Sequence, residues 1–430
     1  MKAFISYLLL AGLFCLPLGG ETLTQEQIDA NTKSFDYIWQ TVRDNHWDPD
    51  MGGLDWDAVR VELRPKVAAA KTMDEARRVM YDMLGRLKLS HFSIIPQEAY
   101  RKMAGTDMPE VDGHTGMDVR VLDGTAVVTN VDEGSPADKA GIRPGWQVLR
   151  INDETLADLL PAIIEAFKGS ITLELNTFAA ITRRLRGPVG KDISLVLKDG
   201  NGKEHSLALQ LAEPKGKPFQ LGFLPPIAVW LEQRRLPGDI GYIAFNSFMD
   251  PSRIMPLFNE AMASFQNTRG LVIDLRGNLG GMGIMAMGMM GWFCSEKGHN
   301  LGVMRMRGNE LKLAIMPRPN VYQAPVAVLI DGVSISCAEF MAQGFKDLGR
   351  GRLFGSNSCG MALPSQVKKL PNGDGLQFVF AYYESEKGHV LEGKGVAPDE
   401  TVVLDTQSLL QGKDPVLAAA SAWINEQHTK

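Results

Sequence analysis

The sequence is poor in the features that would place the protein in a specialised class. Only four of its 430 residues are cysteines, and their spacing does not fit a metal site. The 45 basic and 50 acidic residues give a formal net charge of −5, so we expect neither nucleic acid nor an anionic membrane as a partner. Internal repeats and low-complexity tracts are absent. What remains, with 45% hydrophobic residues, is a globular chain long enough for two or three domains.

Long apolar runs are also scarce, and the one at the N-terminus is short. Lys2 precedes an apolar stretch, 3–18, that ends in Gly19-Gly20. This pattern predicts a signal peptide over residues 1–20, cleaved near Gly20. We therefore expect an exported protein, periplasmic or extracellular, with no stable membrane span after cleavage. Cys294, Cys337 and Cys359 would remain, either as one disulfide and one free thiol or as three thiols.

The periodicity of apolar residues divides the rest of the chain into three regions. Residues 22–105 show helical spacing, with start signals at Asp55 and at Thr72-Met-Asp-Glu75. Residues 107–213 alternate as strands, with a hairpin turn at Gly200-Asn-Gly202. A linker is expected at 215–218. Residues 219–428 alternate strands with helices, which predicts crossover units and a largely parallel sheet.

Four stretches combine polar and glycine residues in a way that could serve catalysis. They are Asp274-Leu-Arg-Gly-Asn-Leu-Gly-Gly281, the turn around Ser334 and Ser336, the loop around Glu392, and Ser90-His91. Ser336 lies where the buried run 325–330 turns into a helix, a place that offers free N–H groups and a positive dipole end. Each stretch also has a structural interpretation: a tight turn, a helix N-cap, a solvated carboxylate, or a buried histidine. Spacing alone does not choose among the seven histidines.

Several sequence blocks, in order, resemble one known family. Asp274 to Gly281, Val333-Ser-Ile-Ser-Cys-Ala-Glu339 and Glu392-Gly-Lys-Gly-Val-Ala-Pro-Asp399 resemble the core of the C-terminal processing peptidase and tricorn family. His114-Thr-Gly-Met-Asp-Val119 and 134–152 resemble a PDZ domain, and 54–58 resembles the family's helical N-terminal domain. The resemblance implies a multidomain α+β fold with a helical domain, a PDZ domain and a C-terminal α/β core of the crotonase-like and ClpP-like type.

The resemblance also implies site residues. In one branch of the family the serine pairs with a lysine, but Met361 stands at that position here. In the tricorn-like branch the base is a histidine, and Ser90-His91 and Glu392 match that pattern. The implied roles are Ser336 as nucleophile, His91 as base, Ser90 and Glu392 as its partners, and the N–H groups of Cys337 and of Gly280 or Gly281 as the oxyanion hole.

The expected function is therefore that of an exported serine endopeptidase of the tail-specific kind, acting on protein or peptide substrates. A substrate tail would bind in the PDZ domain at Gly116, Met117, Asp118 and Val119. No metal or other cofactor is implied, and a homo-oligomer is left open. Two alternatives stay open: an inactive family member that binds peptides or other ligands, and a serine/lysine enzyme that recruits Lys368, Lys369 or Lys394.

Overall fold

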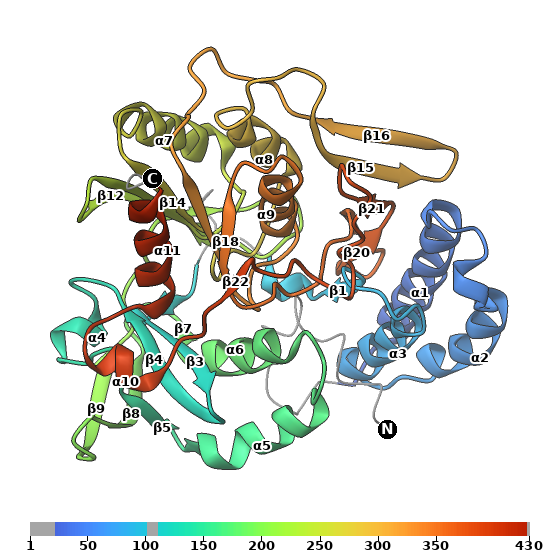
Figure 1. Cartoon of the computed structure of the whole chain (residues 1–430). Helices are drawn as coiled ribbons and strands as arrows, with labels where there is room; N and C mark the ends of the chain where they lie inside the picture. Colours follow the sequence, from blue (N-terminus) through green and yellow to red (C-terminus); the bar gives the residue numbers. More distant parts are fainter. Residues whose placement is uncertain (1–21, 101–110, 428–430) are drawn as a thin grey trace.

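The computed structural model describes residues 22–100 and 111–427, so the expected signal peptide at 1–20 lies outside the described residues. Figure 1 shows three regions in chain order: blue helices, a green-to-cyan β module, and a yellow-to-red α/β region. Each region contributes its own buried hydrophobic cluster. Among the described residues no helix has the length and apolar character needed to cross a bilayer.

The N-terminal region is helical, as the sequence predicts. Its helices are α1 (Gln25–Asn45), α2 (Trp56–Ala68) and α3 (Met73–Gly85), with short 3-10 turns at Met51–Gly53 and Gln97–Ala99. The side chains of Thr24, Asp55 and Thr72 cap them by accepting backbone N–H groups of the first turns.

After α3 the chain leads through Ser90 and His91 into a strand that ties the helices to the rest of the molecule. This strand, β1 (Ser93–Ile95), pairs antiparallel with β20 (Gly375–Val379), which in turn pairs with β19 (Ser365–Lys369). Leu376 and Phe378 of β20 belong to the same hydrophobic cluster as the helices. The helical region therefore shares its core with the C-terminal region, and this packing fixes the position of His91.

The second region is the β module. Its elements are β2 (Gly113–His114), β3 (Met117–Leu122), β4 (Thr125–Val131), α4 (Pro136–Lys139), β5 (Gln147–Ile151), β6 (Glu154–Thr155), α5 (Leu156–Ala166), α6 (Leu173–Arg184), β7 (Arg186–Gly187), β8 (Asp192–Lys198) and β9 (Glu204–Gln210). The main sheet has the order β3-β4-β5-β8-β9. The predicted strands and the hairpin turn at 200–202 are confirmed. Helices α5 and α6 were not predicted.

The expected linker at 215–218 is partly ordered into a sheet. Lys217–Phe219 forms β10, which pairs antiparallel with β11 (Ile227–Val229). The pairing attaches the chain to the third region before the central sheet begins.

The third region has a six-stranded central sheet of order β12-β13-β14-β17-β18-β22. The strands are β12 (Leu231–Leu236), β13 (Ile240–Phe245), β14 (Gly270–Asp274), β17 (Val326–Ile330), β18 (Arg352–Gly355) and β22 (Glu400–Thr401). All neighbours pair in parallel except β12 with β13. The predicted, largely parallel sheet is confirmed.

Helices cover both faces of this sheet. On one face lie α7 (Pro251–Ser264), α8 (Gly283–Met290) and α9 (Cys337–Asp347), and on the other lies α11 (Pro415–Glu426), preceded by α10 (Thr406–Leu410). In β17, Val328 packs toward the first face, and Leu329 packs toward α11, as the two-residue strand period requires. A smaller sheet of β16 (Asn309–Ala314), β15 (Asn300–Met306) and β21 (Tyr382–Glu384) lies near the N-terminal helices (Figure 1).

Candidate active site

Ser336 occupies the turn between β17 and α9, as the sequence predicts. It has φ 58° and ψ −117°, a strained conformation for a residue with a side chain, of the kind that costs about 1–3 kcal/mol and gathers at functional sites. Its N–H donates to the carbonyl oxygen of Met361 at 3.0 Å and to Oε2 of Glu339 at 2.9 Å. The serine thus sits at the N-terminus of an eleven-residue helix, where the dipole favours negative charge.

The glycine-rich loop after β14 lies directly against Ser336. A Cβ on Gly280 would fall 2.7 Å from the Cβ of Ser336 and 3.1 Å from the backbone nitrogen of Cys337. Only a residue without a side chain allows this approach. The thiol of Cys337 donates to the carbonyl oxygen of Gly281 at 3.0 Å, which joins the two loops on the other side.

The three predicted oxyanion donors are not equivalent. The N–H of Gly280 already donates to Oδ1 of Asn278 at 2.9 Å. None of the hydrogen bonds within residues 22–100 and 111–427 uses the N–H of Gly281 or of Cys337. These two groups therefore retain a free donor beside the serine. Gly280 has no free N–H group, and its feature is the close packing of its backbone against Ser336.

A hydrogen-bonded relay connects Glu392, Ser90 and His91. The hydroxyl of Ser90 donates to Oε2 of Glu392 at 2.9 Å and lies 2.7 Å from Nδ1 of His91. An ionised carboxylate can only accept, so the Ser90 proton points to Glu392 and Nδ1 of His91 must donate to Ser90. That tautomer leaves Nε2 of His91 unprotonated, as a general base requires.

The relay is held by the backbone as well as by side chains. Glu392 also accepts the N–H of Ser90 at 2.8 Å and the N–H of Ala362 at 3.0 Å. Burial raises the pKa of the Glu392 carboxyl, and these donors lower it. Burial lowers the pKa of His91 to about 4, so the imidazole is neutral, and able to accept a proton, throughout the physiological range.

The structure brings the relay and the nucleophile to the two ends of one short segment. Met361 accepts the N–H of Ser336, and the next residue, Ala362, donates to Glu392. Within the described part of the chain no hydrogen bond joins His91 directly to Ser336. Catalytic pairs often form that bond only with substrate in place. Sequence reasoning named Ser336, Ser90, His91 and Glu392, and all four lie around this segment.

Sequence reasoning missed Glu339, which lies inside the site and is fully buried. Its signal was present, because Ser336-Cys-Ala-Glu339 has the spacing of a capping box, in which the fourth side chain reaches back to the N-cap N–H. The structure contains that hydrogen bond. Asn278 was also missed as the partner of Gly280.

The apolar surroundings of the serine come from two regions of the chain. Val333, Ile335 and Cys359 form one small hydrophobic cluster with Leu175 of α6, and Leu279, Met361 and Phe178 pack against it, partly buried. The thioether of Met361 offers no proton acceptor of lysine type at this place. All three described cysteines are free thiols, so no disulfide forms among them.

Of the predicted peptide-binding residues, Met117, Asp118 and Val119 lie in β3, the outer strand of the β module, and Gly116 directly precedes that strand. Gly116 has φ 81°, and a Cβ there would fall 2.0 Å from the Cβ of Ser135. Met117 and Val119 are buried in the module's core. Among the described residues β3 has no partner strand on its outer edge, and α6 packs beside it. An open strand edge next to a helix is the arrangement into which peptides add as an extra strand.

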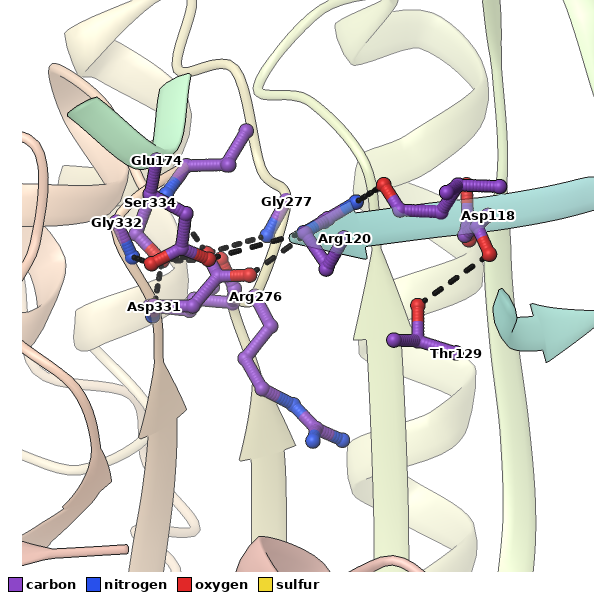
Figure 2. A network of polar contacts seen from close by, with 12 residues as sticks. Asp118, Arg120, Thr129, Glu174, Arg276, Gly277, Asp331, Gly332 and Ser334 are labelled. Carbon is purple, nitrogen blue, oxygen red and sulfur yellow. Dashed lines mark hydrogen bonds and ion pairs between the residues drawn. The ribbon is translucent and has the colours of Figure 1, made fainter. Parts of the chain in front are cut away.

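Figure 2 shows that this module contacts the loop that leads to the nucleophile. Arg120 of β3 lies with Nη2 3.4 Å from Oδ2 of Asp331, and Glu174 of α6 accepts the N–H of Gly332 at 3.1 Å. Asp331 in turn accepts the N–H groups of Gly277 and Val333. The β module is therefore connected both to the glycine-rich loop and to the loop before Ser336.

The titration of Glu174 depends on this contact. Burial and the neighbouring charge of Asp331 raise the pKa of the Glu174 carboxyl to about 7, while Arg120 opposes the shift.

Among the described residues no cluster of three or more His, Cys, Asp or Glu side chains is arranged to hold a metal ion.

Three known families match successive parts of the chain. Residues 30–85 match the tricorn protease C1 domain, residues 127–176 match the PDZ domain, and residues 239–402 match peptidase family S41. The matches follow the order of the three regions of the structure. They confirm the family resemblance, the PDZ assignment and the multidomain fold class read from the sequence.

Curated relatives carry related names at low identity. The chain is 22% identical over 449 residues to carboxyl-terminal-processing peptidase 3, chloroplastic, of Arabidopsis thaliana, covering 100% of this chain and 83% of that protein. It is 25% identical over 371 residues to the carboxyl-terminal-processing protease of Picosynechococcus, covering 85% and 81%. It is 24% identical over 290 residues to the carboxy-terminal processing protease CtpB of Bacillus subtilis, covering 66% and 54%.

Solved structures share the fold. The photosystem II D1 C-terminal processing protease aligns with a TM-score of 0.54 and 20% identity, covering 92% of this chain and 99% of that one. Mature CPAF aligns with a TM-score of 0.60 and 14% identity, covering 93% and 96%. The tricorn protease aligns with a TM-score of 0.51 and 21% identity, covering 93% of this chain and 37% of that one.

Proposed function

We propose that this chain, whose residues 239–402 match peptidase family S41, is a serine endopeptidase whose base is a histidine. The observation that carries the proposal is the Glu392–Ser90–His91 relay, with Ser90 hydrogen-bonded to both neighbours. Met361 stands at the place of the lysine used in the other branch of the family, which argues against the competing design. The lysine alternatives are disfavoured in part because Lys368 lies over the ring of Phe378.

In the proposed mechanism the hydroxyl of Ser336 attacks the scissile carbonyl carbon while Nε2 of His91 takes its proton. The N–H groups of Cys337 and Gly281 stabilise the oxyanion, helped by the dipole of α9. His91 then gives the proton to the leaving amine. Water, activated by the same imidazole, hydrolyses the acyl-enzyme and restores Ser336. Ser90 and Glu392 hold the tautomer of His91 that each step needs.

We propose further that substrate tails bind along the outer edge of β3. The edge is open among the described residues, and Gly116, directly before β3, has a positive φ that allows a tight loop there. The proposal includes export to the periplasm or the cell exterior, which rests on the N-terminal sequence 1–20.

The proposal is tested by hydrolysis of fluorescently labelled casein by the purified mature chain, with Ser336→Ala and His91→Ala beside it. His389→Ala serves as the matched control, because His389 is exposed and its nearest acidic partner is Asp347 at 3.7 Å. We expect hydrolysis by the wild type and the control and none by the other two variants. Full activity of His91→Ala would show that another residue, such as a lysine, acts as the base.

A folded wild type that neither cleaves casein nor reacts with a fluorophosphonate would favour the alternative, a family member that only binds peptides. Peptide binding measured at the β3 edge would then be its function. In that case the relay would be a structural feature of the fold.

A further inference from the structure

A second buried carboxylate lies beneath the nucleophile, and the mechanism above does not use it. Glu339 is in the first turn of α9, and its exposed fraction is 0%. Four donors converge on it: the hydroxyl of Ser358 at 2.7 Å, and the N–H groups of Gly360 at 2.7 Å, Ser336 at 2.9 Å and Met361 at 3.1 Å. A fully buried carboxylate so surrounded is more than a helix cap.

We infer that Glu339 is a positioning residue: its ionised carboxylate fixes Ser336 against the segment 360–362 and thereby sets the nucleophile relative to the base. The inference rests on the proposed function, because it concerns the same serine and histidine. It assigns to Glu339 a part in the reaction without contact to the substrate.

All four acceptor sites of the Glu339 carboxylate are used. Oε1 accepts from Ser358 and Gly360, and Oε2 accepts from Ser336 and Met361. Three of the four donors are backbone N–H groups, which cannot turn into acceptors. A proton on Glu339, or the amide of a glutamine in its place, would set a donor against a donor and break at least one bond.

The strained backbone of Ser336 depends on the same carboxylate. Two acceptors of its N–H group hold the positive φ of Ser336: Oε2 of Glu339 and the carbonyl oxygen of Met361. Glu339 also holds Met361 by its N–H. Loss of the carboxylate charge would therefore loosen both restraints at once.

The segment that Glu339 binds also contacts the partner of the base. Glu339 binds the N–H groups of Gly360 and Met361, and Glu392 binds the N–H group of the next residue, Ala362. Two carboxylates thus accept hydrogen bonds from consecutive residues of the segment 360–362, Glu339 on the side of Ser336 and Glu392 on the side of His91. A displacement of the nucleophile relative to a reacting partner by about 1 Å can cost about 100-fold in rate.

Burial raises the pKa of the Glu339 carboxyl to about 7, with Ser358 and the backbone donors opposing the shift and Glu392 adding to it. The other titratable groups that face it are Cys359 and Tyr383. Their pKa values are raised by burial, so both are neutral near pH 7. Since burial lowers the pKa of His91 to about 4, the histidine does not titrate in this range.

The experiment is the pH dependence of kcat and KM for casein-derived peptide cleavage between pH 5.5 and 9, together with the rate of fluorophosphonate labelling. The variants are Glu339→Gln and Ser358→Ala. The matched control is Asp347→Asn, which removes another buried carboxylate from the same helix, one that accepts from Gln343 and Lys387. Glu174→Gln is included because the pKa of Glu174 is also about 7.

We expect the kcat of the wild type to fall as pH drops through about 7, while KM stays unchanged. This fall is the acidic limb of the pH profile. Glu339→Gln should lose about 100-fold in kcat and show no limb between pH 6 and 8. Asp347→Asn should keep wild-type kcat, and Glu174→Gln should keep the limb. Ser358→Ala removes a donor that stabilises the charged form, so its limb should move to higher pH.

The inference is overturned if folded Glu339→Gln retains kcat within threefold of the wild type, or if the wild-type profile is flat from pH 6 to 8. If Glu339→Gln does not fold, an unmoved limb in Ser358→Ala overturns it. Complete inactivity of the wild type would instead refute the proposed function itself. The two failures are therefore distinguishable.

Discussion

Gly280 offers a direct test of how closely the glycine-rich loop must approach the nucleophile. Its φ is +76°, and a Cβ built there would lie 2.7 Å from the carbonyl oxygen of Ile335 and 2.7 Å from the Cβ of Ser336. Carbon atoms pack at about 3.5–4.0 Å. The change Gly280→Ala must therefore push one of the two loops away by about 1 Å.

The expected magnitude has two parts. An alanine in the left-handed region costs about 1–2 kcal/mol, and overpacking at a tight contact costs about 1–3 kcal/mol, so the thermal midpoint should fall measurably. A shift of the serine by about 1 Å should lower the rate of fluorophosphonate labelling by about 100-fold. The two effects are separated by labelling at a temperature well below the midpoint of the variant.

Gly283→Ala is the matched control. Gly283 is three residues along the same chain segment, at the start of α8, and a Cβ there would meet nothing within 4 Å. It should label at the wild-type rate and be as stable or slightly more so. Labelling of Gly280→Ala within threefold of the wild type, or an equal loss in Gly283→Ala, would refute the geometry described for the oxyanion side of the site.

Three further predictions follow from the contacts of the site. Ser90→Ala removes the link between Glu392 and His91 and should lower kcat by about 10- to 1,000-fold with little change in KM, measured by peptide hydrolysis. Arg120→Ala leaves Glu174 and Asp331 facing each other without their cation. The thermal midpoint should fall more at pH 8 than at pH 6, because the raised pKa of Glu174 lets its carboxyl become neutral as pH falls. An equal loss of thermal midpoint at the two pH values would contradict this. Burial lowers the pKa of His91 from 6.5 to about 4, so the unfolded chain binds an extra proton between these pH values. The free energy of unfolding should therefore fall by about 3 kcal/mol as pH drops through that window. Urea unfolding at pH 7 and pH 4.5 should show a smaller fall in the free energy of unfolding for His91→Gln than for the wild type.

The parts of the fold that the sequence predicts are those set by local signals. Asp55 and Thr72 start helices because a short side chain there satisfies a first-turn N–H. The apolar runs before Asp274 and before Asp331 form buried parallel strands because both their faces are covered by helices.

The parts that were missed depend on context. Helix α5 contains Pro161 in its interior, and a proline there argues against a helix by removing a hydrogen bond. Lys217 to Phe219 became a strand because a partner, β11, lies beside it, which no local pattern reveals.

The site was only partly accessible to sequence reasoning. The strand-to-helix turn contains both Ser334 and Ser336 and also fits a helix N-cap, so the family resemblance was needed to select Ser336 as the nucleophile. His91 lies far from it in the chain, and only the resemblance selected it among seven histidines. The occupied N–H of Gly280 and the four donors around Glu339 require coordinates. Hydrogen-bond satisfaction of buried groups is a property of the folded chain and not of any one segment.

The central claim, that Ser336 is activated by His91, is tested most directly by mapping a fluorophosphonate adduct with peptide mass spectrometry in the wild type and in His91→Ala. The structure predicts one adduct, on Ser336, whose rate of formation falls by about 1,000-fold or more without the imidazole. An adduct on another residue, or an undiminished rate on Ser336 in His91→Ala, would contradict the account.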